Sequence, residues 1–245
     1  MHSGAIVLRY DGLKLLGVLN CPDGSPRSRH PAVLFLHGFP GAEKNVDVQR
    51  RLLERGIASL ALSFGGAWGS EGRYSFSELV PQARAALRYL RRQPFVDGRR
   101  LAVFGFSVGG WAALSVAAQE PALSAVVAVA PAGGVEMIGP HNRERIARLS
   151  RPLRVRSVDW LTADFRRAVR RFDPHAAAAR RSCPLLLVHG DADEMVPDSV
   201  SRTLFAEARP PKRLVVAGGA AHDFLDRRDW LVRLTAGWLE RRLGR

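Results

Sequence analysis

The amino-acid sequence predicts an α/β protein with a mostly parallel, eight-stranded sheet, helices on both faces and an antiparallel hairpin at the N-terminal edge. Short apolar runs alternate with amphipathic stretches along most of the chain, which is typical of parallel strands joined by crossover helices. Only Asp11-Gly12 separates the first two runs, and so short a connection predicts a tight turn between antiparallel strands. The 245 residues suffice for a large core, so we expect a single domain over residues 1–245.

Eight apolar runs are the expected strands. They cover residues 5–10, 13–20, 32–37, 57–64, 101–106, 125–130, 185–190 and 213–218. The clearest helix covers residues 75–93, where leucines and alanines recur on one face and Ser75 and Glu78 are spaced to form a capping box. Further helices are expected directly after residue 107 and from 229 to 243, the last with an apolar stripe suited to packing on the sheet.

One segment interrupts this alternation. About 50 residues separate the sixth expected strand from the seventh, which is too long for a simple loop. Residues 143–181 hold twelve arginines and four acidic residues. We expect two or three short helices here, forming a cap or lid insert at about residues 135–182 over one end of the sheet.

The charge balance is strongly basic. The chain has 37 Lys and Arg against 23 Asp and Glu, a net charge of +14. Such an excess of positive charge is found in proteins that bind nucleic acid or anionic surfaces. It also results from a general compositional bias toward arginine. The sequence has no zinc-finger spacing, RNA-binding aromatic segment or phosphate-binding glycine loop. We therefore expect no nucleic-acid partner, and the oligomeric state stays open between monomer and homodimer.

The sequence also predicts where the protein works. Its first residues lack a basic start followed by an apolar run, so we expect no signal peptide. No stretch approaches 18 consecutive apolar residues, so we expect no membrane-spanning helix. Cys21 and Cys183 are too few for a disulfide framework and have no metal-binding spacing. These observations favour a cytoplasmic protein.

A serine framed by glycines is the strongest chemical signal. Gly105-Phe106-Ser107-Val108-Gly109 joins an expected strand to an expected helix, and this G-x-S-x-G pattern is typical of a sharp turn that presents a nucleophile. Small residues are needed because strand and helix approach closely, and the helix N-terminus favours negative charge at the serine oxygen. Ser107 is the candidate nucleophile, although the motif alone leaves a simple tight turn open.

A serine nucleophile needs a base and an acid. His222 follows the last expected strand, where such a base is suitably placed; a surface or helix-capping histidine is the alternative. Three acidic residues follow the preceding strand: Asp191, Asp193 and Glu194. One of them would hold the histidine in the correct tautomer.

Four motifs in this order resemble those of the α/β-hydrolase-fold serine hydrolases. They are HGFPG (37–41), GFSVGG (105–110), HGDADEMVP (189–197) and GGAAHDF (218–224). The sequence is most similar to the branch that holds small bacterial esterases, feruloyl esterase-like enzymes and the catalytic domains of prolyl-oligopeptidase-type peptidases. The order serine, acid, histidine is also the order of that fold.

The resemblance implies an α/β-hydrolase fold and assigns roles to residues. Asp193 matches the acid of the family pattern HG-x-x-D-x-x-V-P, so the implied catalytic triad is Ser107, Asp193 and His222. The backbone N–H groups of Phe39 and Val108 match the oxyanion hole. Asp191 is then a turn or loop-capping residue, and His37 is expected to organise its loop.

The sequence departs from the family after the fourth strand. Where relatives often have an aromatic residue, arginine and glycine, this chain has Phe64, Gly65 and Gly66. Trp68, in the same loop, is a candidate residue of the substrate pocket, with loop packing as the equal alternative.

These residues predict a serine hydrolase that cleaves short or medium acyl esters, or aryl esters, through an acyl-enzyme intermediate. No metal or organic cofactor is required, and the expected partner is a small-molecule ester; the basic insert suggests acidic acyl groups. An aminopeptidase or acyl-peptide hydrolase is the main alternative. A non-catalytic protein that binds an anionic partner on a hydrolase scaffold is a third hypothesis.

Overall fold

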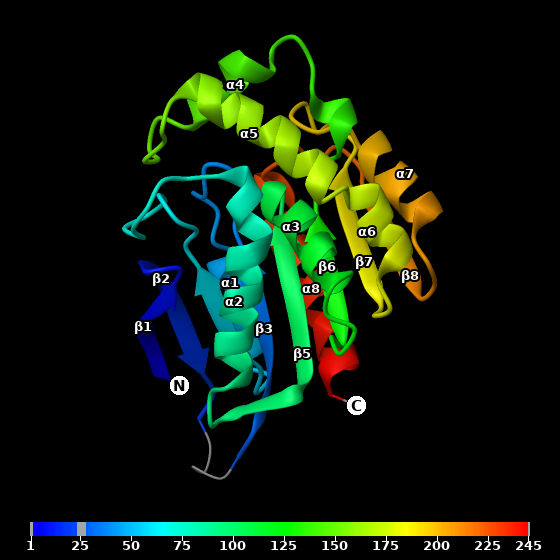
Figure 1. Ribbon diagram of the computed structural model, residues 1–245. Helices are drawn as coiled ribbons and strands as arrows, with labels where there is room; N and C mark the ends of the chain where they lie inside the picture. Colours follow the sequence, from blue (N-terminus) through cyan, green and yellow to red (C-terminus); the bar gives the residue numbers. More distant parts are fainter. Residues whose placement is uncertain (1, 24–27, 245) are drawn as a thin grey trace.

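A twisted sheet of eight strands organises the computed structural model, which describes residues 2–23 and 28–244 (Figure 1). The strands are β1 (His2–Tyr10), β2 (Leu13–Cys21), β3 (His30–Leu36), β4 (Ala58–Leu62), β5 (Val96–Phe106), β6 (Ala125–Val129), β7 (Leu185–Gly190) and β8 (Lys212–Ala217). Their order is β1-β2-β4-β3-β5-β6-β7-β8. Strand β2 runs antiparallel to both neighbours, and all other pairs are parallel. The predicted sheet and its edge hairpin are confirmed.

The hairpin turn has the backbone that its sequence predicts. Asp11 and Gly12 adopt φ of 46° and 75°, and two successive positive φ angles match the twist of the flanking strands. Tyr10 at the end of β1 pairs with Leu13 at the start of β2. The turn therefore sets the register of the whole edge.

Helices cover both faces of the sheet (Figure 1). On one face lie α2 (Leu79–Arg91), α3 (Val108–Ala117) and α7 (Ser199–Glu207); on the other lie α1 (Val46–Leu53) and α8 (Arg228–Leu243). Every residue of α3 is buried, because α2 and α6 flank it above the sheet. An all-apolar helix of this kind needs neighbours on every side.

The predicted capping box at the start of the 75–93 helix is wrong. The chain forms a 3-10 turn, η1 (Phe76–Glu78), before α2 begins at Leu79. The Ser75 hydroxyl donates to Asp164 Oδ2 at 2.9 Å, and Glu78 Oε2 accepts from the Tyr10 hydroxyl at 2.7 Å. Both capping side chains are thus engaged by distant parts of the chain.

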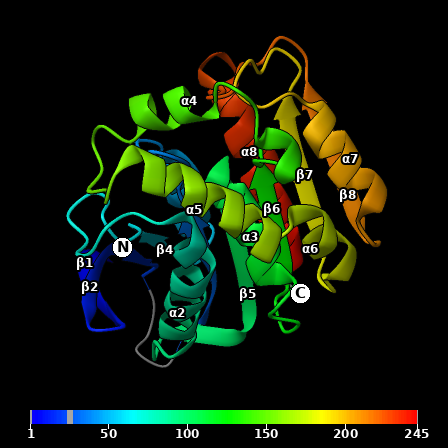
Figure 2. The same ribbon diagram turned by 45° about the horizontal axis from the view of Figure 1, so that its top comes forward.

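The segment between β6 and β7 lies over the carboxyl ends of the parallel strands (Figures 1 and 2). It contains a second 3-10 turn, η2 (Val135–Met137), and the helices α4 (Asn142–Leu149), α5 (Val158–Arg171) and α6 (Pro174–Arg180). A third 3-10 turn, η3 (Leu225–Arg227), follows β8 near the same edge.

Several hydrogen bonds attach this segment to the rest of the protein. Buried Asp164 of α5 accepts from the Ser77 hydroxyl at 2.6 Å as well as from Ser75. The Arg154 N–H donates to the Gly66 carbonyl at 2.8 Å. The Trp111 indole donates to the Phe172 carbonyl at 2.6 Å. Helix α5 and the residues on either side of it are therefore tied to the loop after β4, to η1 and to α3.

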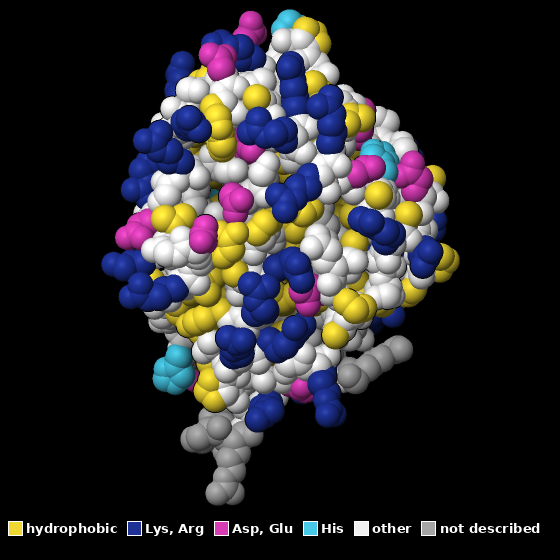
Figure 3. All heavy atoms as spheres, in the orientation of Figure 1, with side chains coloured by type: hydrophobic (Ala, Val, Ile, Leu, Met, Phe, Trp, Pro, Cys, Tyr) yellow, Lys and Arg dark blue, Asp and Glu magenta, His cyan; other side chains and the backbone are white. Residues whose placement is uncertain are grey.

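Basic side chains are spread over the surface. In the view of Figure 3, Lys and Arg predominate over acidic side chains and are interspersed with polar and apolar atoms. Some are paired, as Arg143 Nε is with Asp159 Oδ1 at 2.6 Å. On this face the positive charge is distributed and not gathered into one groove.

His175, at the start of α6, joins three elements. Its Nδ1 lies 2.7 Å from Glu207 Oε2 at the end of α7, and its Nε2 lies 3.0 Å from Glu136 Oε1 in η2. Carboxylates only accept hydrogen bonds, so both ring nitrogens donate and the ring is charged. Burial opposes this charge, but the two carboxylates outweigh it and raise the pKa of His175 above its ordinary 6.5.

We expect His175→Gln to lower the melting temperature by more at about pH 6 than at about pH 9. Because the pKa is higher in the folded state, the charged contact contributes fully below the unfolded pKa. Its contribution is lost as the pH rises through the folded pKa. His141→Gln is the control, since His141 faces Glu144 with side chains 82% and 81% exposed. Thermal unfolding at both pH values checks this; an equal deficit at both would contradict it.

Candidate active site

Ser107 occupies a strained turn between β5 and α3. Its backbone has φ 55° and ψ −122°, a region that non-glycine residues rarely adopt. A Cβ on Gly105 would lie 2.0 Å from the Gly109 carbonyl oxygen, and one on Gly109 would lie 2.2 Å from the Leu36 carbonyl oxygen. Glycine is required at both positions because the helix begins directly against β5 and β3.

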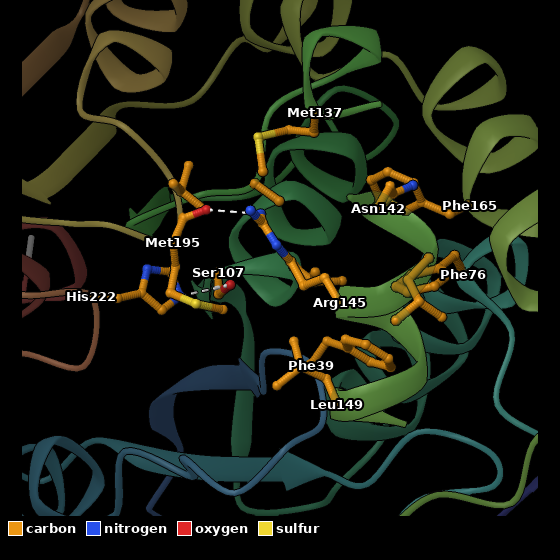
Figure 4. Close-up of a pocket in the computed structure, with 14 residues that line it drawn as sticks. Phe39, Phe76, Ser107, Met137, Asn142, Arg145, Leu149, Phe165, Met195 and His222 are labelled. Carbon is orange, nitrogen blue, oxygen red and sulfur yellow. Dashed lines mark hydrogen bonds between the residues drawn. The ribbon is translucent and has the colours of Figure 1, made fainter. Parts of the chain in front are cut away.

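The structure brings Ser107, His222 and Asp193 together (Figure 4 shows the first two). His222 Nε2 lies 3.0 Å from Ser107 Oγ, and His222 Nδ1 lies 2.6 Å from Asp193 Oδ2. Since the carboxylate accepts, Nδ1 carries the proton, and Nε2 is left to accept from the serine hydroxyl. The three side chains come from the loops after β5, β8 and β7, which parallel strands bring to one edge.

Asp193 is held as a carboxylate. Its Oδ1 accepts from the backbone N–H groups of Met195 and Val196, both at 2.8 Å. Burial opposes ionisation, but hydrogen bonds from His189, His222 and the backbone outweigh it and hold the pKa of Asp193 well below its usual range. The carboxylate therefore stays charged while it faces the imidazole.

The loop after β3 is ordered by His37, which is buried. His37 Nδ1 donates to the Gly38 carbonyl at 2.7 Å, and Nε2 accepts from the Phe64 N–H at 3.2 Å. Burial and the nearby Lys44 lower the pKa of His37 to about 3, so the ring is neutral. This pair of bonds joins the loop that carries Phe39 to the loop after β4.

Phe39 and Val108 both line the cavity beside Ser107. Within residues 2–23 and 28–244, the backbone N–H of neither residue donates a hydrogen bond to another protein group. Val108 is the first residue of α3, where backbone donors have no partner inside the helix.

A small cavity of about 60 Å³, partly open to solvent, lies over Ser107. The lining is mainly apolar and comes from both the sheet edge and the segment above it (Figure 4). The lining residues are Phe39, Phe76, Ser107, Val108, Ala132, Met137, Asn142, Arg145, Ile146, Leu149, Phe165, Met195, Val196 and His222.

Two further sequence expectations concern residues near the site. Trp68 is not among the residues that line this cavity; its side chain is 47% exposed, and its indole donates to the Pro40 carbonyl at 3.1 Å. Asp191 accepts from the Gly219 N–H at 2.6 Å and so bonds to the loop that carries His222.

The loop after β4, in which Gly65 stands where relatives often have an arginine, is held by other hydrogen-bonding groups. The Gly65 N–H donates to Gln82 Oε1 at 2.8 Å. The Arg154 guanidinium, from the segment above, donates to the Ser70 carbonyl. An arginine from elsewhere in the chain thus supports the loop in which Gly65 replaces one.

Sequence reasoning missed three residues of the site. His189 is fully buried, with Nε2 2.9 Å from the Val196 carbonyl and 3.2 Å from Asp193 Oδ2. Asn142 and Arg145 of α4 line the cavity. His189 is the first residue of the motif that contains Asp193, and this position could have identified it as part of the site. Asn142 and Arg145 have only their spacing on one helix face in common, which is a much weaker signal.

Two further features concern metal binding and membrane insertion. Within residues 2–23 and 28–244, no group of three or more His, Cys, Asp or Glu side chains is arranged to hold a metal ion. Over the same ranges, no helix is both long and apolar enough to cross a membrane.

Comparisons with known proteins identify the family of the chain. A profile of the prolyl oligopeptidase family matches residues 64–244. The uncharacterized protein Rv2307c of Mycobacterium tuberculosis is 32% identical over 232 residues, which cover 94% of this chain and 76% of that protein.

Two solved structures show the fold. The 2,6-dihydroxy-pseudo-oxynicotine hydrolase matches with a TM-score of 0.82 and 22% identity, over 98% of this chain and 68% of its own. Est1E from Butyrivibrio proteoclasticus matches with a TM-score of 0.78 and 23% identity, over 99% and 100%. The predicted α/β-hydrolase fold is confirmed, and with the profile match the chain is identified as a hydrolase that belongs to the prolyl oligopeptidase family.

Proposed function

We propose that the protein is a serine hydrolase that cleaves carboxylic esters of short or medium acyl chains, or aryl esters, through an acyl-enzyme intermediate. The observation that carries the proposal is the continuous contact from Ser107 Oγ to His222 Nε2, at 3.0 Å, and from His222 Nδ1 to Asp193 Oδ2, at 2.6 Å. This arrangement can activate a hydroxyl as a nucleophile.

The proposed reaction begins when Ser107 Oγ attacks the ester carbonyl and His222 Nε2 takes the serine proton. Asp193 stabilises the imidazolium without taking a proton, as its low pKa favours. His222 then gives the proton to the departing alcohol as the C–O bond breaks and the acyl-enzyme forms. Water, deprotonated by the same histidine, attacks the acyl group and releases the acid and free Ser107.

The carbonyl oxygen becomes negatively charged in both steps. In the proposed mechanism it accepts hydrogen bonds from the backbone N–H groups of Phe39 and Val108, which have no other protein acceptor in the described residues. Two such donors, fixed in position before the reaction, stabilise the transition state by about 3–4 kcal/mol each in comparable sites. The contacts of His37 hold the Phe39 loop in place.

Membership of the prolyl oligopeptidase family favours a second candidate, an aminopeptidase or acyl-peptide hydrolase. An aminopeptidase needs an anionic group to hold the free α-amino group of its substrate. Among the described residues, no Asp or Glu lines the cavity over Ser107. This lining supports the ester as the first choice, with the amide as the alternative.

Ser107→Ala is expected to lower kcat by several powers of ten, because it removes the nucleophile. The variant should keep the melting temperature and circular dichroism of the wild type, since the alanine side chain is smaller. The measurement is hydrolysis of p-nitrophenyl butyrate by both proteins. A folded Ser107→Ala variant with wild-type activity would rule out this nucleophile.

Asp193→Asn is expected to lower kcat on the order of 10³–10⁴-fold. The amide can donate to Nδ1, which favours the tautomer whose Nε2 already carries a proton and cannot accept from Ser107. Asp191→Asn is the matched control, because it lies two residues away and its amide oxygen can still accept from the Gly219 N–H. Equal losses in both variants would argue against a specific role for Asp193.

The bond that is cleaved can be tested with two substrate series. We expect Ser107-dependent hydrolysis of p-nitrophenyl esters, from acetate to palmitate, with a preference for short or medium chains because the cavity over Ser107 is small. We expect aminoacyl p-nitroanilides to react far more slowly. If the anilides are cleaved as efficiently as the esters, the peptidase alternative is the correct one.

A further inference from the structure

The far wall of the cavity is formed by α4, which places Asn142 and Arg145 three residues apart along its inner side. Their polar ends point apart, the Asn142 amide toward Phe165 and the Arg145 guanidinium toward Met195 (Figure 4). We infer that this wall binds polar groups of the substrate, and that the Arg145 guanidinium is its binding subsite for a carboxylate. The preferred substrates are then esters whose apolar body carries a second, free carboxylate. This inference rests on the proposed function, since it names the substrate class of the same site.

Asn142 is the first observation. Its side chain is 9% exposed, and its Nδ2 is buried without a hydrogen-bond partner among the described residues. A buried amide donor without an acceptor costs about 1–3 kcal/mol of stability. An acceptor on a bound substrate would supply the missing partner.

Arg145 is the second, independent observation. Its Nη1 donates to the Met195 carbonyl at 3.1 Å, and within residues 2–23 and 28–244 it forms no ion pair. Figure 4 shows the guanidinium between Ser107 and Met137 in that view, with the bond to Met195 dashed. A guanidinium has five N–H donors, so most of them are available to a ligand.

The surroundings of Arg145 make it selective for an anion. Its half-buried guanidinium shares the cavity with apolar side chains such as Met137 and Leu149, and no carboxylate lines that cavity among the described residues. Charges interact more strongly where water is partly excluded, and arginine binds carboxylates with two parallel hydrogen bonds. The apolar side chains that share the cavity suit the body of the substrate.

A structural role for Arg145 is the competing explanation. The bond from Arg145 to the Met195 carbonyl reaches the loop that carries Asp193. If Arg145 had only a structural role, loss of this bond would displace Asp193. Such a disturbance would slow all esters alike, whereas loss of a carboxylate subsite slows only carboxylated ones. The ratio of kcat/KM for two esters therefore separates the explanations.

The kinetic test compares mono-p-nitrophenyl adipate with p-nitrophenyl hexanoate, which has the same acyl length without the carboxylate. We expect wild type to favour the adipate about tenfold or more in kcat/KM, and Arg145→Met to remove this preference mainly by raising KM for the adipate. Arg145→Lys should retain part of it. Arg148→Met is the matched control, because Arg148 is exposed on the same helix, and it should keep the full preference.

Asn142→Leu gives a second readout. Since it removes an unsatisfied buried donor that points away from Arg145, it should raise the melting temperature and leave the preference for the adipate unchanged. Loss of the preference in this variant, with Arg145 intact, would contradict the assignment of the carboxylate subsite to Arg145.

A binding measurement tests the carboxylate subsite independently of catalysis. Calorimetry on the Ser107→Ala protein should show monoethyl adipate binding at least tenfold more tightly than diethyl adipate, and Arg145→Met should abolish the difference. Equal binding of the two esters would overturn the subsite, even if wild type hydrolyses neutral esters. Arg145-dependent binding without any Ser107-dependent hydrolysis would instead uphold the subsite and refute the proposed function.

Discussion

The close contact between β5 and the first turn of α3 is the constraint on which the rest of the site depends. Because no side chain fits between Gly105 and Gly109, the helix begins directly behind the strand and turns Ser107 toward the cavity. The Ser107 carbonyl accepts from the N–H groups of Gly110 and Ala132, at 2.8 and 3.0 Å. These bonds hold the strained backbone and fix the end of β6 beside it. The acid, histidine and Phe39 loops then reach the same edge because their strands run parallel to β5.

Charge is distributed unevenly around this edge. The carboxylate of Asp193 is surrounded by N–H donors that keep it ionised. The guanidinium of Arg145 has no counter-ion among the described residues and donates to the carbonyl of Met195, whose own N–H donates to Asp193. A backbone residue thus links the unpaired positive charge to the loop that holds the carboxylate.

The parts of the protein that could be predicted from sequence have local signals. Alternating apolar runs gave the strands, and short motifs identified the candidate serine, acid and histidine. The other features depend on contacts between distant segments, which leave no local pattern. Ser75 bonds to Asp164 instead of capping its own helix, because α5 lies across η1. Asn142 and Arg145 line the cavity only because α4 docks over the sheet edge, and Trp68 lies outside it because its indole bonds to a neighbouring loop.

The segment above the sheet is attached to the rest of the protein in two ways. Helix α5 and the residues that flank it, Arg154 and Phe172, are hydrogen-bonded to η1, to the loop after β4 and to α3. Helix α4 packs on α5 and places Ile146 in the hydrophobic core. Sequence variation in this segment is therefore expected at exposed positions of α4, such as Glu144 and Arg148, and not at Ile146.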